Sequence, residues 1–294
     1  MLLVCLMGKF IRLTLAAWFW AALFTCHLLQ FHPLSQLNTM KIASWNVNSL
    51  NVRLDHVLQW LESAGPDVLA LQETKMTDEV FPLKAINEAG YQVVFSGQKT
   101  YNGVAILAKS QPDEVITDIP DLDDPQRRIL AATVDDVRII NLYVVNGSAP
   151  GTEKFTYKLN WLDKVTAFIE QQMTEYDDVV VLGDFNIAPD DRDVHDPKKW
   201  HEKILCTTEE RQALHRILDL GFQDSFRYLH DEDGFFSWWD YRMNGFARNL
   251  GLRIDLILSS DEMSEAISAS YIDLEPRKWE RPSDHTPVIT EFDW

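Results

Sequence analysis

Residues 179–186 read Val179-Val180-Val181-Leu182-Gly183-Asp184-Phe185-Asn186, in which an apolar run leads into a glycine and two polar side chains. A short run of this kind, rich in β-branched residues, is typical of a strand buried on both faces. The glycine permits a sharp turn, after which Asp184 and Asn186 project from the strand end. The segment therefore predicts a central strand of a covered sheet that presents polar groups at its end.

The same pattern of an apolar strand ending in polar residues recurs along the chain. Residues 41–46 alternate apolar and polar side chains and end at Asn46, and residues 68–71 form an apolar run that leads to Gln72 and Glu73. Further strands are expected at residues 103–107, 129–134, 138–144, 252–258 and 288–292. Because catalytic groups commonly lie on loops held at strand ends, this recurrence points to an active site.

Helices are expected between these strands. Apolar residues recur with helical spacing from Leu54 to Leu61, until Gly65-Pro66 ends the helix. A second helix is expected at residues 154–173 and a third at residues 209–220, capped by Gly221. Residues 190–206 are expected to form a long loop. Strands that alternate with helices predict an α/β fold of mixed strand direction.

Length and composition indicate an ordinary globular protein. The chain has 294 residues, 46% of them hydrophobic, which suffices for one large domain or two small ones. Its three cysteines are Cys5, Cys26 and Cys206. Since only Cys206 lies in the body of the chain, a disulfide framework and a cysteine metal site are both excluded there.

The first 39 residues differ from the rest. An uncharged run at residues 13–29 follows Lys9 and Arg12, as in a signal or anchor segment, although it is at the lower limit for a spanning helix. The alternative is a translation start assigned too early, which we favour because Met40 leads directly into a predicted strand. The expected domains are therefore an extension at 1–39 and a catalytic domain at 40–294.

Net charge argues against general affinity for nucleic acid. The chain carries 27 basic and 45 acidic side chains, a formal charge of −18. Basic residues nevertheless cluster at Arg127–Arg128, among Arg242, Arg248 and Arg253, and among Arg277, Lys278 and Arg281. This balance predicts weak, salt-sensitive binding of phosphates that relies on metal and pocket contacts.

The polar residues at strand ends share a chemistry. They are Asn46, Glu73, Tyr143, Asp184, Asn186, Asp255, Asp284 and His285. Carboxylate and amide oxygens suit a hard cation such as Mg²⁺ or Mn²⁺. Phosphodiester hydrolysis needs a metal to neutralise phosphate charge, a base to orient water and donors for the developing oxyanion, and this set supplies all three.

Eight short motifs occur in an order that resembles one known family. They are Ser44-Trp45-Asn46-Val47-Asn48, Leu71-Gln72-Glu73-Thr74-Lys75, Gly97-Gln98-Lys99 with Tyr101-Asn102-Gly103-Val104-Ala105, Pro125-Gln126-Arg127-Arg128, Gly183-Asp184-Phe185-Asn186, Ser237-Trp238-Trp239-Asp240-Tyr241-Arg242, Leu252-Arg253-Ile254-Asp255 and Ser283-Asp284-His285-Thr286-Pro287-Val288. Over residues 40–294 the chain is similar to the exonuclease III (AP endonuclease family 1) branch of the endonuclease/exonuclease/phosphatase superfamily. The resemblance implies a four-layered αββα sandwich, with two mixed β-sheets face to face and helices outside.

The resemblance also implies roles around the metal and the attacking water. Glu73 would be the principal metal ligand, beside Asn46 and with Asp284 able to contribute. Asp184 would orient or deprotonate the water and Asn186 would hydrogen-bond the scissile phosphate, and both count among the candidate metal contacts. Taken alone, each has a structural alternative, such as a surface acid for Glu73 or an Asx turn for Asp184.

Further roles concern phosphate and DNA. His285 would hydrogen-bond a phosphate oxygen while Asp255 fixes its ring, and Tyr143 would place its phenol on the phosphate or leaving group. Trp238 would line the pocket for an unpaired sugar, although its aromatic surroundings also fit a core position. The resemblance makes Lys75, Arg128 and Arg242 candidate contacts to the DNA backbone, but basic residues on a surface often have no specific role.

One departure concerns the residues after Tyr143. The family usually has an aromatic residue, Pro and Gln there, whereas this chain has Val144, Val145 and Asn146 followed by Gly147. Contacts to the substrate strand are therefore expected to differ. The departure leaves open the balance between abasic-site incision, 3′ to 5′ exonuclease action and removal of blocked 3′ ends.

The predicted function is Mg²⁺-dependent hydrolysis of DNA phosphodiester bonds in base excision repair. The expected substrate is double-stranded DNA with abasic sites or 3′ ends, bound by a monomer without an obligate protein partner, in the cytoplasm at the nucleoid. The hydrophobic N terminus leaves membrane anchoring open. Two different functions also fit parts of the sequence: a lipid or phosphoinositide phosphodiesterase of the same superfamily, and an inactive interaction module. Such a module would lack motif acids, and none is missing.

Overall fold

A computed structural model of the protein describes residues 39–120, 122 and 124–294. The proposed extension at residues 1–39, with Cys5 and Cys26, lies outside the described residues except for Thr39. Thr39 already belongs to the first strand, β1 (Thr39–Asn46). The described Cys206 is buried and has a free thiol.

Six strands form the first sheet, in the order β13-β14-β1-β2-β4-β3. They are β1, β2 (Val68–Gln72), β3 (Gln92–Ser96), β4 (Val104–Ala108), β13 (Ile267–Ile272) and β14 (Val288–Asp293). Strands β1 and β2 are parallel, and their other neighbours are antiparallel. This sheet is therefore mixed, and the carboxyl ends of β1 and β2 lie at the same edge.

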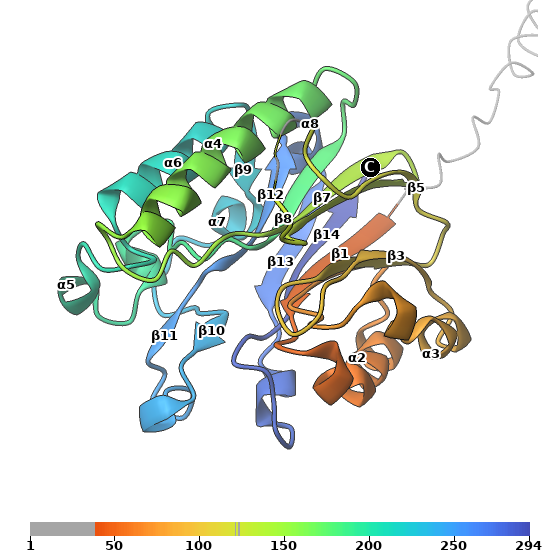
Figure 1. Cartoon of the computed structure of the whole chain (residues 1–294), viewed down its shortest axis with the longest axis horizontal. Helices are drawn as coiled ribbons and strands as arrows, with labels where there is room; N and C mark the ends of the chain where they lie inside the picture. Colours follow the sequence, from red (N-terminus) through yellow and green to blue (C-terminus); the bar gives the residue numbers. More distant parts are fainter. Residues whose placement is uncertain (1–38, 121, 123) are drawn as a thin grey trace, which may run out of the picture. The chain divides into compact units, whose positions relative to one another are not determined.

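Six further strands form the second sheet, in the order β5-β6-β7-β8-β12-β9. They are β5 (Asp113–Ile116), β6 (Ile129–Val134), β7 (Val137–Tyr143), β8 (Val179–Asp184), β9 (Phe222–Asp224) and β12 (Asp255–Ser260). Here β7 and β8 are the parallel pair. A two-stranded ribbon, β10 (Trp238–Trp239) with β11 (Gly251–Leu252), leads into β12 beyond the edge of the sheet (Figure 1).

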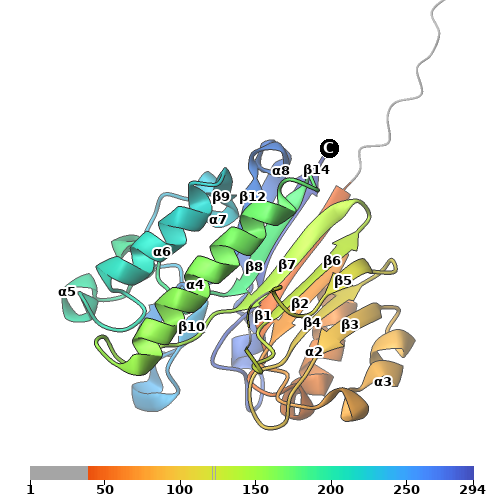
Figure 2. The ribbon, with the colours of Figure 1, turned by 45° about the horizontal axis from the view of Figure 1, so that its top comes forward.

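The two sheets face one another across a shared apolar core. Side chains from both sheets meet there, among them Ile42 and Ala70 from the first and Ile139 and Leu182 from the second. Helices cover the outer faces: α2 (Leu50–Ala64) and α3 (Leu83–Glu88) pack on the first sheet, and α4 (Glu153–Gln172) and α6 (Thr208–Leu218) on the second (Figure 2). The predicted four-layered αββα sandwich is confirmed.

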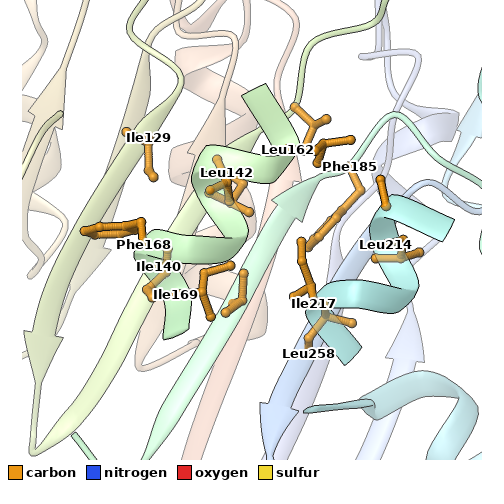
Figure 3. Close-up of a cluster of buried hydrophobic side chains, with 14 of the residues drawn as sticks. Ile129, Ile140, Leu142, Leu162, Phe168, Ile169, Phe185, Leu214, Ile217 and Leu258 are labelled. Carbon is orange, nitrogen blue, oxygen red and sulfur yellow. The ribbon is translucent and has the colours of Figure 1, made fainter. Parts of the chain in front are cut away.

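The packing of α4 and α6 follows from their apolar stripes. Leu162, Phe168 and Ile169 of α4 and Leu214 and Ile217 of α6 point towards the strands in Figure 3. Each of these side chains is almost completely buried. Helix α6 begins with a capping box, in which Thr207 and Glu210 satisfy each other's backbone N–H groups.

Short elements complete the chain. They are α5 (Pro197–Trp200), α7 (Ser225–Leu229), α8 (Asp261–Glu265) and the 3-10 turns η1 (Asp78–Val80), η2 (Asp191–Asp193), η3 (Arg242–Asn244) and η4 (Glu275–Lys278). Two of them, η2 and α5, lie in the segment 190–206, for which the sequence predicts a loop throughout. Strands β3, β5, β9, β10 and β13 are not predicted by the sequence, because they are short or carry exposed polar residues.

Three predicted details are wrong. The strand expected at residues 252–258 is two strands, because at Arg253 and Ile254 the backbone turns to bond Asp193 and Phe185 instead of a neighbouring strand. The helix expected to reach residue 220 ends at Leu218, with Asp219 as its cap, two residues before Gly221.

The third correction concerns Gly183, which lies inside β8 and does not form a turn. Its φ is +139°, and a Cβ atom there would lie 1.9 Å from the carbonyl oxygen of Leu142 on β7. Close approach of the two strands is therefore the reason for this glycine.

Candidate active site

Strand register brings the polar strand ends together. Asn46 at the end of β1 pairs with Gln72 at the end of β2, so that Glu73 follows directly. In the second sheet Tyr143 pairs with Asp184, and Asp184 also pairs with Asp255. Because the two sheets lie face to face, both groups of side chains open on one cleft. Residues far apart in the sequence thus form one site.

Asn46 connects the two groups. Its buried amide nitrogen donates to Glu73 Oε1 at 3.0 Å and to Asp184 Oδ2 at 2.9 Å. Its amide oxygen accepts the backbone N–H of Asn48. In this arrangement Asn46 therefore orients two carboxylates and turns its oxygen away from them.

His285 is held between two carboxylates. Its Nδ1 donates to Asp255, with Nδ1 to Oδ2 at 2.9 Å, and its Nε2 lies 3.8 Å from Asp184 Oδ2. Burial alone would lower the pKa of His285, but Asp255 and Asp184 outweigh burial and raise this pKa to about 10. The ring is consequently a charged donor at neutral pH, and the imidazolium ion holds the cluster of Asp184, Asp255 and His285 together.

Asp184 is buried at the floor of the cleft. Burial raises the pKa of its carboxyl group to about 7, against the opposing effect of His285. Its Oδ1 accepts the backbone N–H of Asn186, and its Oδ2 accepts the side-chain amide of Asn186 at 3.2 Å. A pKa in this range suits a group that accepts a proton near neutral pH.

Asn186 sits just after the end of β8 in a left-handed conformation, with φ at +49°. Its amide nitrogen also donates to the Val144 carbonyl oxygen, and its amide oxygen accepts from Asn146 Nδ2 at 3.0 Å. Asn146, one of the residues that departs from the family pattern, is thus a direct neighbour of Asn186. Glu73 and Lys75 likewise have positive φ values, +55° and +54°. Such strain concentrates at functional sites.

Tyr143 donates its hydroxyl proton to Glu73 Oε1 at 2.8 Å. Burial, followed by the charges of Glu73 and Asp184, raises the pKa of this phenol well above its usual value, so that it keeps its proton. Arg128 stacks on the Tyr143 ring at 4.5 Å and donates to the Tyr143 carbonyl oxygen. It is not among the residues that line the cleft, and its guanidinium is used within the protein.

The donor set fits a hard cation. Glu73 and Asp284 present carboxylates to the cleft, and Lys75 Nζ already lies 2.6 Å from Glu73 Oε2, so a positive charge is accommodated there. Asn48 joins these residues, because its amide oxygen accepts from Lys75 Nζ at 2.6 Å and its amide nitrogen donates to Asp284 at 2.8 Å. Oxygen donors without cysteine are the ligands that Mg²⁺ prefers.

The cleft has a volume of about 350 Å³ and mixed walls. Trp238 forms part of one wall, and its Nε1 donates to Asp284 at 3.1 Å. A backbone bridge pairs Trp238 with His285, which fixes the indole beside the acidic floor. Trp200, Ile204 and Leu205 also line the cleft. A rigid apolar wall beside carboxylates suits a sugar held next to a phosphate.

The basic candidates differ in position. Lys75 lies inside the site on Glu73, with about a quarter of its side chain exposed, instead of on the open surface. Arg242 is at the rim, where 86% of its side chain is exposed and it pairs with Asp240.

Seven residues of the site were missed by the sequence-based prediction. Trp200, Ile204 and Leu205 could not be found from the sequence, because residues 190–206 carry no periodic pattern. Asn48, Asp240 and Ile254 could have been found, since they lie within the quoted motifs, and so could Asn146, which lies in the segment after Tyr143 that departs from the family pattern.

Comparison with known proteins agrees with this geometry. The chain matches the Endonuclease/Exonuclease/phosphatase family over residues 43–285. Exodeoxyribonuclease III of Haemophilus influenzae is 36% identical over 266 residues, which cover 86% of this chain and 100% of that protein.

Solved structures are similar as well. A 3′ phosphatase from Neisseria, bound to a product DNA hairpin, is 53% identical with a TM-score of 0.86, and the match covers 87% of this chain and 100% of that chain. An AP endonuclease from Archaeoglobus fulgidus is 37% identical with a TM-score of 0.83, covering 86% and 99% of the two chains. Within the part of the chain from Thr39 onwards that the structure describes, no helix is long and apolar enough to cross a membrane.

Proposed function

Because the chain belongs to the Endonuclease/Exonuclease/phosphatase family, we propose that it is a metal-dependent DNA repair nuclease of the exonuclease III type. It hydrolyses phosphate esters at the 3′ ends of duplex DNA and beside abasic sites. The domain that carries this activity is the proposed one at residues 40–294. The observation that carries the proposal is the convergence of Asn46, Asp184 and His285 at the cleft floor.

The proposed chemistry starts from Asp184. Its carboxylate orients a water molecule and accepts its proton, which the pKa of about 7 favours. The water oxygen attacks phosphorus, the bond between phosphorus and the 3′ oxygen breaks, and the 3′ oxygen leaves with the electron pair. Asn186 and the charged His285 ring donate hydrogen bonds to the phosphate oxygens, while Asp255 keeps the ring charged and oriented. Tyr143, which retains its proton, donates to the phosphate or the leaving group.

Glu73 is the proposed principal ligand of Mg²⁺, for which Mn²⁺ can substitute, and Asp284 is the second carboxylate. A cation there supplies neutralisation of the phosphate charge. Asn46 serves this site by orienting Glu73, since its amide nitrogen and not its oxygen faces the carboxylates. Lys75 compensates the charge of Glu73 at the position that a cation would occupy.

DNA contacts follow from the walls of the cleft. Trp238 packs against the sugar next to the scissile phosphate, and Arg242 at the rim contacts the backbone of the strand. Arg128 contributes indirectly, by holding Tyr143. Since the formal charge of the chain is −18, binding depends on these few contacts and weakens with salt.

Processing of 3′ ends is the leading activity within this function. The Neisseria relative at 53% identity is named a 3′ phosphatase and is bound to a product hairpin, which supports the same reaction here. Incision at abasic sites is the second candidate, supported by the AP endonuclease from Archaeoglobus fulgidus at 37% identity. The proposed enzyme acts as a monomer in the cytoplasm, where its substrate places it at the nucleoid.

The test compares three labelled duplexes in the presence of Mg²⁺: one with a 3′ phosphate, one with a single abasic-site analogue and one intact and blunt. Wild type is expected to release phosphate from the first and Asp184→Ala is expected to be inactive on all three. Cleavage only at the analogue would make abasic incision the principal activity. Absence of metal-dependent cleavage of any duplex, or full activity in Asp184→Ala, would overturn the proposed function.

A further inference from the structure

A buried ion pair lies directly behind the cleft and has no part in the chemistry above. Lys158 of α4 and Glu210 of α6 are bonded to each other, and neither side chain has any exposed surface. Burying two charges is costly unless every polar atom of the pair finds a partner. The neighbouring α4 and α6 residues pack well with apolar side chains alone, such as Val165 and Leu214 in the same cluster. Helix packing therefore does not explain the pair.

The ammonium group of Lys158 uses all three of its N–H donors in hydrogen bonds. One goes to Glu210, one to the carbonyl oxygen of Asn186 at 2.8 Å and one to the carbonyl oxygen of Asn146 at 3.3 Å. The side chains of those two asparagines are themselves bonded to each other in the cleft. Lys158 thus holds, from behind, the backbone of both residues at the point where their side chains meet the substrate space.

Glu210 holds the adjoining wall. Its Oε1 accepts the backbone N–H of Leu205 at 3.1 Å, and its Oε2 accepts the backbone N–H and the hydroxyl of Thr207. Leu205 lines the cleft. Gly147 allows this assembly to close, because a Cβ atom there would lie 3.0 Å from Lys158 Cδ and 3.1 Å from Ile204 Cδ1. The pair therefore joins three segments that border the cleft, and it adds to the backbone hydrogen bonds from Val144 N–H to the Asp184 carbonyl oxygen and from Ala188 N–H to the Leu205 carbonyl oxygen.

We propose that Lys158 and Glu210 are positioning residues for hydrolysis, which set the Asn186 amide against the scissile phosphate by fixing its backbone to Asn146 and Leu205. The inference rests on the proposed function. It places the residues that fix the position of the Asn186 amide outside the cleft. Apolar side chains of similar size can fill the same space, but they cannot hold three backbone groups. Replacement of the pair therefore removes the positional control, together with the Glu210 half of the α6 capping box.

The variant that tests this is Lys158→Met with Glu210→Leu, because replacing both partners leaves no unpaired buried charge. Its fold is checked by circular dichroism, since the change also removes the capping box of α6. On the 3′-phosphate duplex we expect kcat to fall by about 10- to 100-fold, as small misplacements of a reacting group do, with KM nearly unchanged. Lys158→Met with Glu210→Gln is a second and milder pair variant, because it also leaves no unpaired buried charge and Gln can keep the capping box of α6. It should lower kcat in the same direction, and it carries the test if Lys158→Met with Glu210→Leu does not fold.

A double-mutant cycle with Asn186→Ala distinguishes an effect of the pair on the position of Asn186 from a general loss of structure. If the pair acts through Asn186, adding Lys158→Met/Glu210→Leu to Asn186→Ala should change kcat much less than it does in the wild type. Val165→Ala is the control in α4: it should lower the melting temperature and leave kcat at the wild-type value.

Two results would overturn the inference. The first is a wild-type kcat in both folded pair variants. The second is a combined variant whose fold-loss of kcat equals the product of the losses in Asn186→Ala and in the pair variant. A wild-type enzyme without metal-dependent activity would instead refute the proposed function, and the two failures are thus distinguishable.

Discussion

Asn46 of β1 and Asp184 of β8 are 138 positions apart in the sequence and share a hydrogen bond of 2.9 Å between the two sheets. The same amide nitrogen reaches Glu73, so one buried side chain sets the spacing between the proposed metal ligand and the proposed base. The two sheets are thereby tied together at the floor of the cleft. Their relative position is part of the active site.

Replacing this link should impair catalysis more than folding. In Asn46→Ala both carboxylates lose a donor, and we expect kcat/KM on a 3′-phosphate duplex to fall by about 10²-fold. Loss of the buried hydrogen bonds should lower the free energy of unfolding by about 1–3 kcal/mol, measured by urea denaturation. The matched control is Asn141→Ala, which removes another buried amide between the sheets, bonded to Gln72 and to the Leu71 and Ala105 carbonyl groups. The control should lose stability and retain activity; equal losses of activity would contradict the role of Asn46.

The charged state of His285 predicts a pH dependence of stability in the metal-free protein. Burial opposes the charge, but Asp255 and Asp184 raise the pKa of the ring to about 10. The pKa of a histidine ring in the unfolded chain is about 6.5. The stability that the charged ring contributes is therefore complete below that pH and is lost as pH rises through the folded pKa. An NMR titration of the ring should therefore have its midpoint near 10.

Asp255→Asn removes the principal support of the His285 charge. In this variant the midpoint should shift down towards the unfolded value, and kcat should fall by at least about 10²-fold because the ring loses its orientation. A wild-type ring that titrates at the unfolded value would show that the carboxylates do not hold the charge.

Metal affinity should respond in opposite directions to changes at Glu73 and Lys75. Glu73→Gln removes a carboxylate from the proposed ligand set and should weaken Mg²⁺ binding by about 10-fold or more in calorimetric titration. Lys75→Met removes the ammonium group that lies 2.6 Å from Glu73 Oε2 and should strengthen binding. Glu79→Gln, on a side chain outside the cleft, is the control and should bind like the wild type. Tighter Mg²⁺ binding by Glu73→Gln would show that Glu73 is not a ligand of the metal.

Gly183 should not tolerate a side chain. In Gly183→Ala the new Cβ atom would lie 1.9 Å from the Leu142 carbonyl oxygen, so β7 and β8 must separate. We expect a loss of more than about 4 kcal/mol in unfolding free energy, or no folded protein. Gly234→Ala is the control, because Gly234 also has a positive φ, +85°, but open space around it. Its cost should be about 1 kcal/mol, from backbone strain alone.

Much of the fold was accessible to sequence reasoning, because apolar periodicity is a local property. The strands at residues 129–134 and 288–293 and the helix near 154–173 are predicted almost to their ends. Prediction failed where tertiary contacts override the local pattern. Arg253 and Ile254 have strand-like composition, but the carbonyl group of Asp193 and the N–H of Phe185 draw their backbone out of the ladder.

The sequence by itself indicated most of the polar residues that line the site. Asn46, Glu73, Asp184, Asp255 and His285 each belong to a short motif at a strand end, and parallel strand ends meet at one edge of a sheet. The motifs and their order also determined the family, because each motif is a local pattern.

Only the tertiary structure decided what each side chain does there. It turned Arg128 onto Tyr143, brought Lys75 onto Glu73, and joined Lys158 to Glu210 behind Asn186. The physical reason is that such partners are chosen by burial and by the need of every buried donor for an acceptor. Those conditions exist only once the two sheets and their helices have packed, so no local pattern of residues specifies them.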